Sequence, residues 1–368
     1  MTVNRIEYKN YRNIETLTLE PSDGVNVIYG ENAQGKTNLM EGIWLFSGLK
    51  SFRGAKDAEL VRFGCGFGRL KMDFSAGGRE QKAEITVDVR RKAKLNGVEL
   101  PSCAGLMGKC SAVVFSPTFL NIVKNGPEER RRFLDAAICQ VKPAYAPLLA
   151  SYHRLVKQRN SLLRDVQFES SLLDMLDVID ERLADAGEAL IRERSSYIER
   201  LIPAAKAIHD GFSGGKEEMT LAYLRKNGGG GKPLRELIKE NRRNDILGRT
   251  TSVGPHRDDI DIKINGISAR SFGSQGQQRS CAAALKLGEA AVMKQITGEQ
   301  PAVLLDDVMS ELDSGRQDYI LNHIKGWQVF ITCCEPSTVL RMCSGRTFRI
   351  EGGRLVENEE CGMRNAEL

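Results

Sequence analysis

The loop Gly30-Glu31-Asn32-Ala33-Gln34-Gly35-Lys36-Thr37 constrains the fold of this chain more than any other feature of its sequence. It follows residues 25–29, an apolar run typical of a buried strand, and it precedes a helical pattern over residues 36–46. Glycines let the backbone N–H groups of such a loop turn inward around a phosphate, and the N-terminus of the helix adds positive potential. A strand, this loop and a helix in that order are the context that a phosphate-binding loop requires. The sequence therefore predicts an α/β nucleotide-binding fold.

The residues of the loop divide between phosphate binding and metal binding. Lys36 is placed to reach the β and γ phosphates of ATP, and the hydroxyl group of Thr37 is a ligand for Mg²⁺. The remaining predicted nucleotide-binding residues of this segment are Gly30, Glu31, Asn32, Ala33, Gln34, Gly35 and Asn38. An ordinary glycine turn with a stray lysine is the alternative, and the flanking strand and helix disfavour it.

A second apolar run, residues 302–305, ends in two carboxylates, Asp306 and Asp307. In a parallel sheet this strand would end at the edge where the phosphates lie. Asp306 is then expected to complete the Mg²⁺ shell. Asp307 could orient or deprotonate the attacking water, so we predict Asp307 and Lys36 as catalytic residues. An acidic turn after a buried strand is common by itself, and it gains weight from the phosphate loop.

Another glycine-containing segment, Ser274-Gln275-Gly276-Gln277, precedes a predicted helix. Small polar residues and glycine before a helix N-terminus again make an anion site. Because the chain already has one phosphate loop, we predict that this segment serves the nucleotide of another subunit. A polar turn that merely caps its own helix is the alternative.

Hydrophobic periodicity divides the chain into three parts. Residues 1–126 are rich in strand patterns, and residues 251–368 return to alternating strands and helices. Between them, residues 127–250 carry two apolar stripes at helical spacing, which predict an antiparallel helical hairpin with Arg159 as the one cation in its first stripe. We expect one ATPase head, built from residues 1–126 and 251–368 and interrupted by a helical insertion at 127–250.

Charge indicates where nucleic acid could bind. The chain has 53 Lys and Arg against 48 Asp and Glu, and the net charge of +5 is too small on its own to argue for nucleic acid. Between residues 225 and 249, however, there are eight basic residues and three acidic ones, a surplus of positive charge equal to that of the whole chain. Four of these basic residues fall largely on one side of a predicted helix, namely Arg235, Lys239, Arg242 and Arg243. They are either DNA contacts or a solvated helix face.

Cysteine usage and hydropathy predict the compartment. Nine cysteines are scattered without a C-x-x-C pair, which suggests neither a disulfide framework nor a zinc site. No stretch approaches the 18 consecutive apolar residues of a membrane span. We expect a soluble, cytoplasmic protein that does not enter a membrane.

Together these segments resemble the ATP-binding-cassette heads of the SMC-like chromosome and repair ATPases, because Leu305-Asp306-Asp307 is followed by Ser310-Glu311-Leu312-Asp313. Within that group the chain resembles the RecF family. The supporting segments are Lys9-Asn10-Tyr11-Arg12-Asn13, residues 50–53, residues 127–135 and above all Gly254-Pro255-His256-Arg257-Asp258-Asp259.

The resemblance implies more than the residues alone. In this family ATP drives two heads together, so that each nucleotide lies between the phosphate loop of one subunit and the signature segment of the other, with Ser274 and Gly276 in the matching positions. Arg12 and Asn13 match positions near the nucleotide, and Asp313 matches the loop that crosses the dimer interface. The implied function is an ATP-dependent homodimer that binds double-stranded DNA near gaps, hydrolyses ATP slowly under DNA stimulation, and helps to load the recombinase with RecR-type and RecO-type mediators at the nucleoid.

Three departures from the wider cassette pattern are present. Asp307 stands where glutamate is commoner, Cys333-Cys334-Glu335 lacks the usual histidine, and residues 115–118 stand where a glutamine-bearing loop is expected. The ATPase subunit of a membrane transporter would share the phosphate loop and the signature, but the helical insertion, the missing histidine and residues 254–259 disfavour it. A P-loop kinase would need no signature segment.

Overall fold

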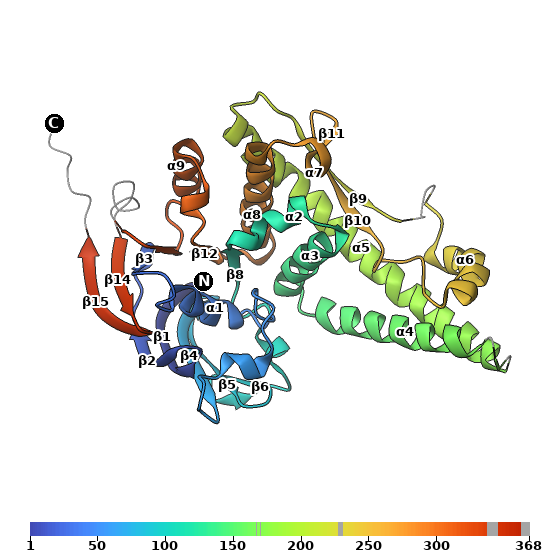
Figure 1. Cartoon of the computed structure of the whole chain (residues 1–368), viewed down its shortest axis with the longest axis horizontal. Coiled ribbons are helices and arrows are strands. Elements are labelled where there is room, and N and C mark those ends of the chain that lie inside the picture. Colours follow the sequence, from blue (N-terminus) through green and yellow to red (C-terminus); the bar gives the residue numbers. More distant parts are fainter. Residues whose placement is uncertain (167, 170, 227–230, 337–344, 362–368) are drawn as a thin grey trace.

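A central parallel sheet carries the phosphate loop. The computed structural model describes residues 1–166, 168–169, 171–226, 231–336 and 345–361 (Figure 1). The strands of the central sheet lie in the order β15 (Arg354–Cys361), β14 (Gly345–Glu351), β3 (Val25–Tyr29), β13 (Val329–Cys333), β12 (Ala302–Asp306) and β8 (Ala112–Phe115). Neighbours are parallel except for β14 and β15. The apolar strands β8 and β12 are buried along their whole length, as strands covered on both faces must be.

The two faces of this sheet belong to different cores. Successive side chains of a strand point to opposite faces. Leu305 packs in a core with α8 (Gln275–Thr297), whereas Leu304 packs in a core with α1 (Lys36–Leu45). The helix that begins at the phosphate loop and the helix that begins at the signature segment therefore lie on opposite faces of the sheet.

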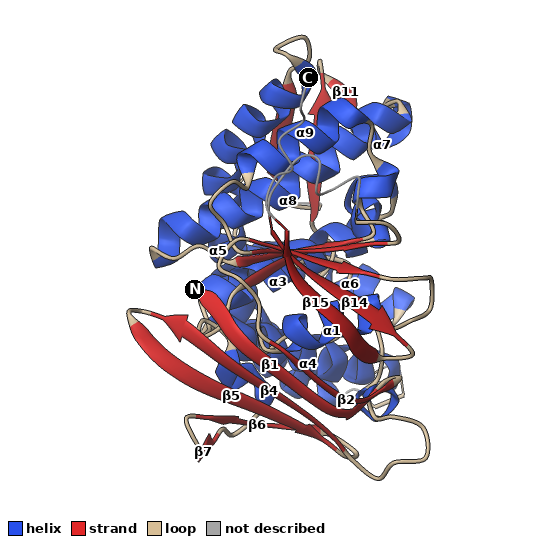
Figure 2. Cartoon of the chain, turned by 90° about the vertical axis from the view of Figure 1, so that its left-hand side faces the viewer, coloured by secondary structure: helices blue, strands red, loops and turns tan. Residues whose placement is uncertain are grey.

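An antiparallel sheet closes the core around α1 (Figure 2). Its strands lie in the order β2 (Ile14–Leu19), β1 (Thr2–Tyr11), β4 (Gly68–Ala76), β5 (Arg79–Val87), β6 (Arg91–Leu95) and β7 (Val98–Glu99). Buried and more exposed residues alternate along β4, so one face of the sheet is apolar and the other meets solvent. The dipeptide Asn96-Gly97, a sequence that favours tight hairpin turns, connects β6 to β7 with φ of 51° and 82°.

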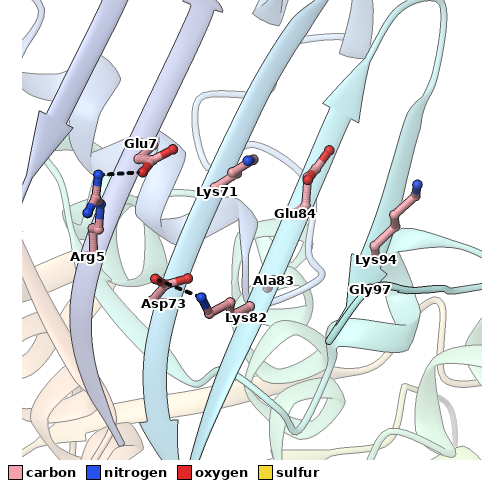
Figure 3. A pocket seen from close by; sticks show the side chains of 9 residues that line it. All are labelled: Arg5, Glu7, Lys71, Asp73, Lys82, Ala83, Glu84, Lys94 and Gly97. Atoms are coloured by element: carbon pink, nitrogen blue, oxygen red, sulfur yellow. Dashed lines mark ion pairs between the residues drawn. The ribbon is translucent and has the colours of Figure 1, made fainter.

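The solvent face of this sheet is lined with charges that alternate in sign from strand to strand (Figure 3). Arg5 stands opposite Asp73, which stands opposite Lys82 on the next strand. The neighbouring row runs Glu7, Lys71, Glu84 and Lys94 in the same alternating manner. These residues line a shallow hollow, and because opposite charges face each other across the strands, the two rows stabilise the sheet.

A long helical arm projects from the head, as the apolar stripes predicted (Figure 1). Its helices are α3 (Pro127–Val141), α4 (Tyr145–Asp165), α5 (Leu172–Ser213) and α6 (Leu234–Gly248), and the short helix α2 (Asn121–Lys124) precedes them beside α8. Helices α4 and α5 form the hairpin, and α5 returns to pack along α8. A Cβ atom at Gly288 of α8 would lie 3.1 Å from Leu201, so glycine lets these two helices approach closely. No helix among the described residues is long and apolar enough to cross a membrane.

A small sheet joins the arm to the last third of the chain. Strand β9 (Met219–Leu224) pairs antiparallel with β10 (Asp259–Ile264), which pairs with β11 (Ile267–Ser268). The other helices are α7 (Ala269–Phe272), α9 (Ser314–His323) and the short 3₁₀ segments η1 (Asp57–Leu60), η2 (Cys103–Leu106), η3 (Pro117–Leu120) and η4 (Met309–Glu311). Since β9 pairs across the expected boundary at residue 250, the three-part division of the chain stays a prediction.

The motif at residues 254–259 forms a buried polar joint between the arm and the head. Nδ1 of His256 accepts a hydrogen bond from the hydroxyl of Tyr152 at 2.7 Å, and Nε2 faces the carbonyl of Thr251 at 3.1 Å and so donates to it. Burial lowers the pKa of His256 to about 4. Arg194 of α5 donates both to Asp135 and to the carbonyl of Pro255. These contacts favour a structural role for His256.

Arg159, the one cation in the apolar stripe of α4, is fully buried. Its Nε donates to Asp180 of α5 at 2.5 Å, and one terminal nitrogen donates to Asp245 of α6 at 2.5 Å and to Thr251 at 3.1 Å. Burial raises the pKa of Asp180, and the hydrogen bond and charge of Arg159 oppose that rise. A charge can be buried here only because it is paired, so Arg159 ties three helices of the arm together.

We predict that Arg159→Ala destabilises the chain by about 3–5 kcal/mol, because it leaves the Asp245 carboxylate buried without its cation. The measurement is the free energy of unfolding in a urea titration. Arg154→Ala, on an exposed face of the same helix, is the matched control and should change it by less than about 0.5 kcal/mol. Equal stabilities of the two variants would contradict the role given to the buried pair.

Candidate nucleotide-binding site

The phosphate loop joins β3 to α1 with strained backbone at both ends. Gly30 and Gly35 have φ of 146° and 113°. A Cβ atom on Gly30 would lie 2.3 Å from the carbonyl oxygen of Ile350, and one on Gly35 would lie 2.8 Å from Oδ1 of Asn13. Only glycine is compatible with both the dihedral angles and the close neighbours. Nζ of Lys36 donates to the carbonyls of Gly30 and Glu31 at 2.6 and 2.8 Å, so the lysine lies along the inside of the loop.

The predicted metal ligands meet at the carboxyl ends of the strands. The hydroxyl of Thr37 donates to Oδ1 of Asp306 at 3.0 Å, and the hydroxyl of Thr332 donates to the same oxygen at 2.9 Å. Burial raises the pKa of Asp306, while the two hydroxyl groups oppose that rise. A carboxylate and a hydroxyl are hard oxygen ligands of the kind that Mg²⁺ prefers, so Thr37 and Asp306 fit the metal. Thr332 was not anticipated from the sequence, because a threonine within an apolar strand has no distinctive pattern.

Asp307 occupies a different environment from its neighbour. It is exposed, and its φ of 54° is unusual for a residue with a side chain. Its backbone N–H donates to the hydroxyl of Thr332 at 2.8 Å, and Ser310 donates to its carbonyl at 2.9 Å. The backbone is thus held in a conformation that separates a buried carboxylate, Asp306, from an open one. That separation fits a metal ligand followed by a general base.

The turn between β1 and β2 holds the phosphate loop from one side. Nδ2 of Asn13 donates to the carbonyl of Gln34 at 3.1 Å, and Oδ1 of Asn13 accepts from Asn38 at 2.8 Å. Arg53 donates in turn to Oδ1 of Asn38 at 2.7 Å. Asn13 and Asn38 therefore lie against the loop, at the place predicted for nucleotide-binding residues.

Glu41 of α1 holds this side of the site together through its hydrogen bonds. Its role was not expected from the sequence. Its carboxylate is fully buried and accepts two hydrogen bonds from Arg12, at 2.8 and 2.9 Å. It also accepts from the hydroxyls of Tyr11 and Ser51. Burial alone would lower the pKa of Arg12, but the hydrogen bonds and charge of Glu41 raise it. Glu41 lies one helical turn after Thr37, so the Thr37-x-x-x-Glu41 spacing is the signal that could have revealed it.

The turn between β14 and β15 holds the loop from the other side. The backbone N–H of Gly352 donates to Oε1 of Gln34 at 2.6 Å, and that of Gly353 donates to the carbonyl of Gln34 at 2.9 Å. Neither strand of this hairpin was expected from the sequence. A hollow beside the loop is lined by Tyr29, Gly30, Glu31, Gln34, Cys334, Glu335, Pro336, Arg349 and Glu351. Oδ1 of Asn32 accepts a hydrogen bond from Sγ of Cys334 at 3.4 Å, and Ala33 beside it is exposed with φ of 64°.

The signature segment caps α8. The hydroxyl of Ser274 accepts from the backbone N–H of Gln277 at 3.2 Å, and Oε1 of Gln277 accepts from the N–H of Ser274 at 2.8 Å. This reciprocal pair is a capping box, so within one subunit the segment caps its own helix, as the alternative interpretation of the sequence expected. Ser274 and Gln275 are nevertheless exposed, and Gly276 lies under the guanidinium of Arg316. Within the described residues no hydrogen bond joins this segment to the phosphate loop, and its service to a second subunit stays a prediction.

The four basic residues of α6 are not equally available to a ligand. Arg235 pairs with Glu181 and Asp185 of α5 at 2.5 and 3.1 Å, and Arg242 pairs with Asp177. Lys239 and Arg243 form no ion pair with any residue that the structure describes. The acidic face of α5 therefore neutralises half of the expected DNA contact, and the rest of that assignment stays a prediction.

We predict that Glu41→Gln weakens ATP binding by about tenfold or more, because the amide cannot hold the Arg12 guanidinium with two charged hydrogen bonds. The measurement is a titration with a fluorescent ATP analogue. Glu41→Asp keeps the charge on a shorter side chain and should lose less. Identical ATP affinities of the parent and Glu41→Gln would contradict the role of Glu41.

Comparisons with known proteins agree with this geometry. The family model described as the RecF/RecN/SMC N terminal domain matches residues 2–352. The DNA replication and repair protein RecF of Acetivibrio thermocellus is 40% identical over 367 residues, which cover 96% of this chain and 99% of that protein. RecF of Clostridium acetobutylicum is 38% identical over 364 residues, covering 97% and 100%.

Solved structures give the same result. The structure of the recombination mediator protein RecF with ATP, from the RecFOR pathway, superimposes with a TM-score of 0.89 at 37% identity and covers 98% of both chains. The Smc head domain of Pyrococcus furiosus has a TM-score of 0.56 at 14% identity, which shows a shared fold alone. These findings favour the repair ATPases over the transporter alternative. The chain belongs to the RecF family of DNA replication and repair proteins, within the SMC-like ATPases.

Proposed function

We propose that this chain binds ATP with Mg²⁺ and hydrolyses it slowly, as a DNA-stimulated switch. The observation that carries the proposal is the meeting of Thr37, Asp306 and Thr332 beside the phosphate loop, where both threonine hydroxyls lie within 3.0 Å of one carboxylate oxygen of Asp306. The solved structure of RecF with ATP supports the choice of nucleotide.

Each group of the site has one task in this proposal. Lys36 exchanges its contacts with the loop carbonyls for the β and γ phosphates, and the backbone N–H groups of the loop surround them. Thr37 and Asp306 hold Mg²⁺, which neutralises charge on the phosphates when it is bound. Asp307 orients the attacking water and accepts its proton. The carboxylate of Asp307 is one methylene shorter than the commoner glutamate, and that difference fits slow turnover.

The second half of the proposal concerns assembly. Ser274 and Gly276 lie on the face of the sheet opposite α1, so one subunit cannot bring its own signature to its own loop. We infer an ATP-dependent homodimer in which Ser274–Gln277 of each subunit covers the nucleotide of the other. The dimer would bind double-stranded DNA near gaps, and hydrolysis would reset it. RecR-type and RecO-type mediators are the proposed partners, since a close structural relative belongs to the RecFOR pathway.

Two substitutions separate ATP binding from hydrolysis. Lys36→Ala should weaken ATP binding at least tenfold, because it removes the point charge that faces the phosphates. Asp307→Asn should bind ATP and Mg²⁺ normally but lose about 10²-fold or more in turnover, because an amide cannot accept the proton of water. Equilibrium ATP binding and phosphate release are measured for both. Unchanged turnover in Asp307→Asn would assign the base to another group.

The trans arrangement has its own test. Ser274→Arg should bind ATP with the affinity of the parent but fail to dimerise, because a bulky cation blocks docking onto the nucleotide of the partner. Sedimentation with and without ATP measures the dimer. Arg270→Ala, a substitution on the preceding helix α7, is the control and should dimerise. A normal ATP-dependent dimer of Ser274→Arg would rule out the trans site.

A further inference from the structure

One row of residues on the solvent face of the antiparallel sheet departs from the alternation of its neighbours. In the two rows of Figure 3, cations and carboxylates alternate from strand to strand. The next row consists of Lys9, Arg69, Thr86 and Lys92, which stand opposite one another on β1, β4, β5 and β6. It contains three cations and no carboxylate. We call these three cations the basic row.

This arrangement costs stability. Like charges that stand directly opposite on neighbouring strands repel each other, and Lys9 faces Arg69. Lys92 pairs with Asp88 at 3.2 Å, but both side chains are exposed, so the pair contributes little. No carboxylate in the described part of the chain forms an ion pair with Lys9 or Arg69. Since the adjacent rows show how the same face can be neutralised, the basic row is suited to an anionic ligand.

A loop with exposed aromatic residues lies beside the basic row. Residues 61–67 connect η1 to β4, and within this loop Phe63 is fully exposed while Phe67 is about half exposed, at 46%. The backbone N–H of Arg62 donates to the carbonyl of Asn10 at 2.9 Å, which places the loop next to Lys9. Phe67 lies two residues before Arg69. We call Phe63 and Phe67 with the residues between them the phenylalanine loop.

The segment η1, which immediately precedes this loop, is attached to the nucleotide site. The backbone N–H of Arg12 donates to the carbonyl of Leu60 at 2.9 Å, and the guanidinium of Arg12 donates to the carbonyl of Glu59 at 3.0 Å. Arg12 is in turn held by the buried Glu41 of α1. A ligand on the phenylalanine loop would therefore act on the turn that contacts the phosphate loop.

We propose that the basic row and the phenylalanine loop bind DNA at a junction between duplex and single strand. The basic row takes the phosphates of the backbone, and Phe63 stacks on an unpaired base. An apolar protein surface would not need three cations, and an uninterrupted duplex would offer no free base face to a protruding aromatic ring. The inference rests on the proposed function, which already places the protein on duplex DNA near gaps, and adds to it the surface that makes the contact.

The first experiment removes two cations from either kind of row in the full chain. Lys9→Ala/Arg69→Ala takes them from the basic row, and the matched control Lys71→Ala/Lys82→Ala takes the same charge from the two alternating rows on the same face. Binding to a blunt duplex and to the same duplex with a single-stranded gap is measured across a salt titration. Each lost phosphate contact should lower the slope of log binding constant against log salt concentration by about one. The slope should therefore fall by about two in the basic-row variant and by less than one in the control.

The second experiment tests the aromatic ring with the same two DNAs. Phe63→Ala should weaken binding to the gapped duplex by about fivefold or more, while binding to the blunt duplex stays within about twofold. Phe63→Trp, which keeps a ring for stacking, should restore the preference for the gap. Unfolding of every variant is followed to show that the fold is kept.

Several results would overturn the inference. Equal salt slopes for the basic-row variant and its control would show that the basic row does not contact DNA. Equal losses of affinity for both DNAs in Phe63→Ala would show that Phe63 does not stack on an unpaired base. A loss of slope in Lys239→Ala/Arg243→Ala alone would place the DNA on α6 instead. Loss of binding to a mediator protein in Phe63→Ala, with DNA binding intact, would assign the loop to a protein partner. A parent chain that binds neither DNA would reject the proposed DNA function as well, whereas the other results leave that function standing.

Discussion

The buried carboxylate of Asp306 is the interaction on which the site depends. It accepts hydrogen bonds from Thr37, in the first turn of α1 after β3, and from Thr332 of β13. Strands β3, β13 and β12 are consecutive neighbours in the sheet, so all three residues reach the same edge. A carboxylate buried this deeply would be costly without such donors. The parallel order of the strands therefore determines both the position of the phosphate loop and the position of the acidic pair.

Two turns from opposite ends of the chain fit the loop to this edge. Asn13 of the β1–β2 turn and Gly353 of the β14–β15 turn each bond to the carbonyl of Gln34. A Cβ atom on Gly353 would lie 2.6 Å from the carbonyl oxygen of Asn13, so the two turns are also in contact with each other. The nucleotide site is consequently built from segments more than 300 residues apart, and its integrity requires the whole head to fold.

Whether a basic residue of this molecule is available to a ligand depends on the acidic residues with which it already pairs. The basic window at residues 225–249 includes α6, yet Arg235 and Arg242 of that helix are paired with acidic residues of α5. The three cations of the basic row form no cluster in the sequence, because Lys9, Arg69 and Lys92 are far apart along the chain. Only the register of the strands brings them opposite one another.

The sequence by itself determined the local chemistry: the phosphate loop, the acidic pair after an apolar strand, the helical hairpin and the hairpin turn at Asn96-Gly97. Each of these depends on neighbouring residues, whose dihedral preferences and periodicity are written in the chain. The tertiary structure alone decided the partner of Arg12, the role of Thr332 and the neutralisation of α6. Those properties depend on which remote side chain shares a buried or facing position, and free energies of burial and charge pairing are set by that neighbour rather than by the order of residues along the chain.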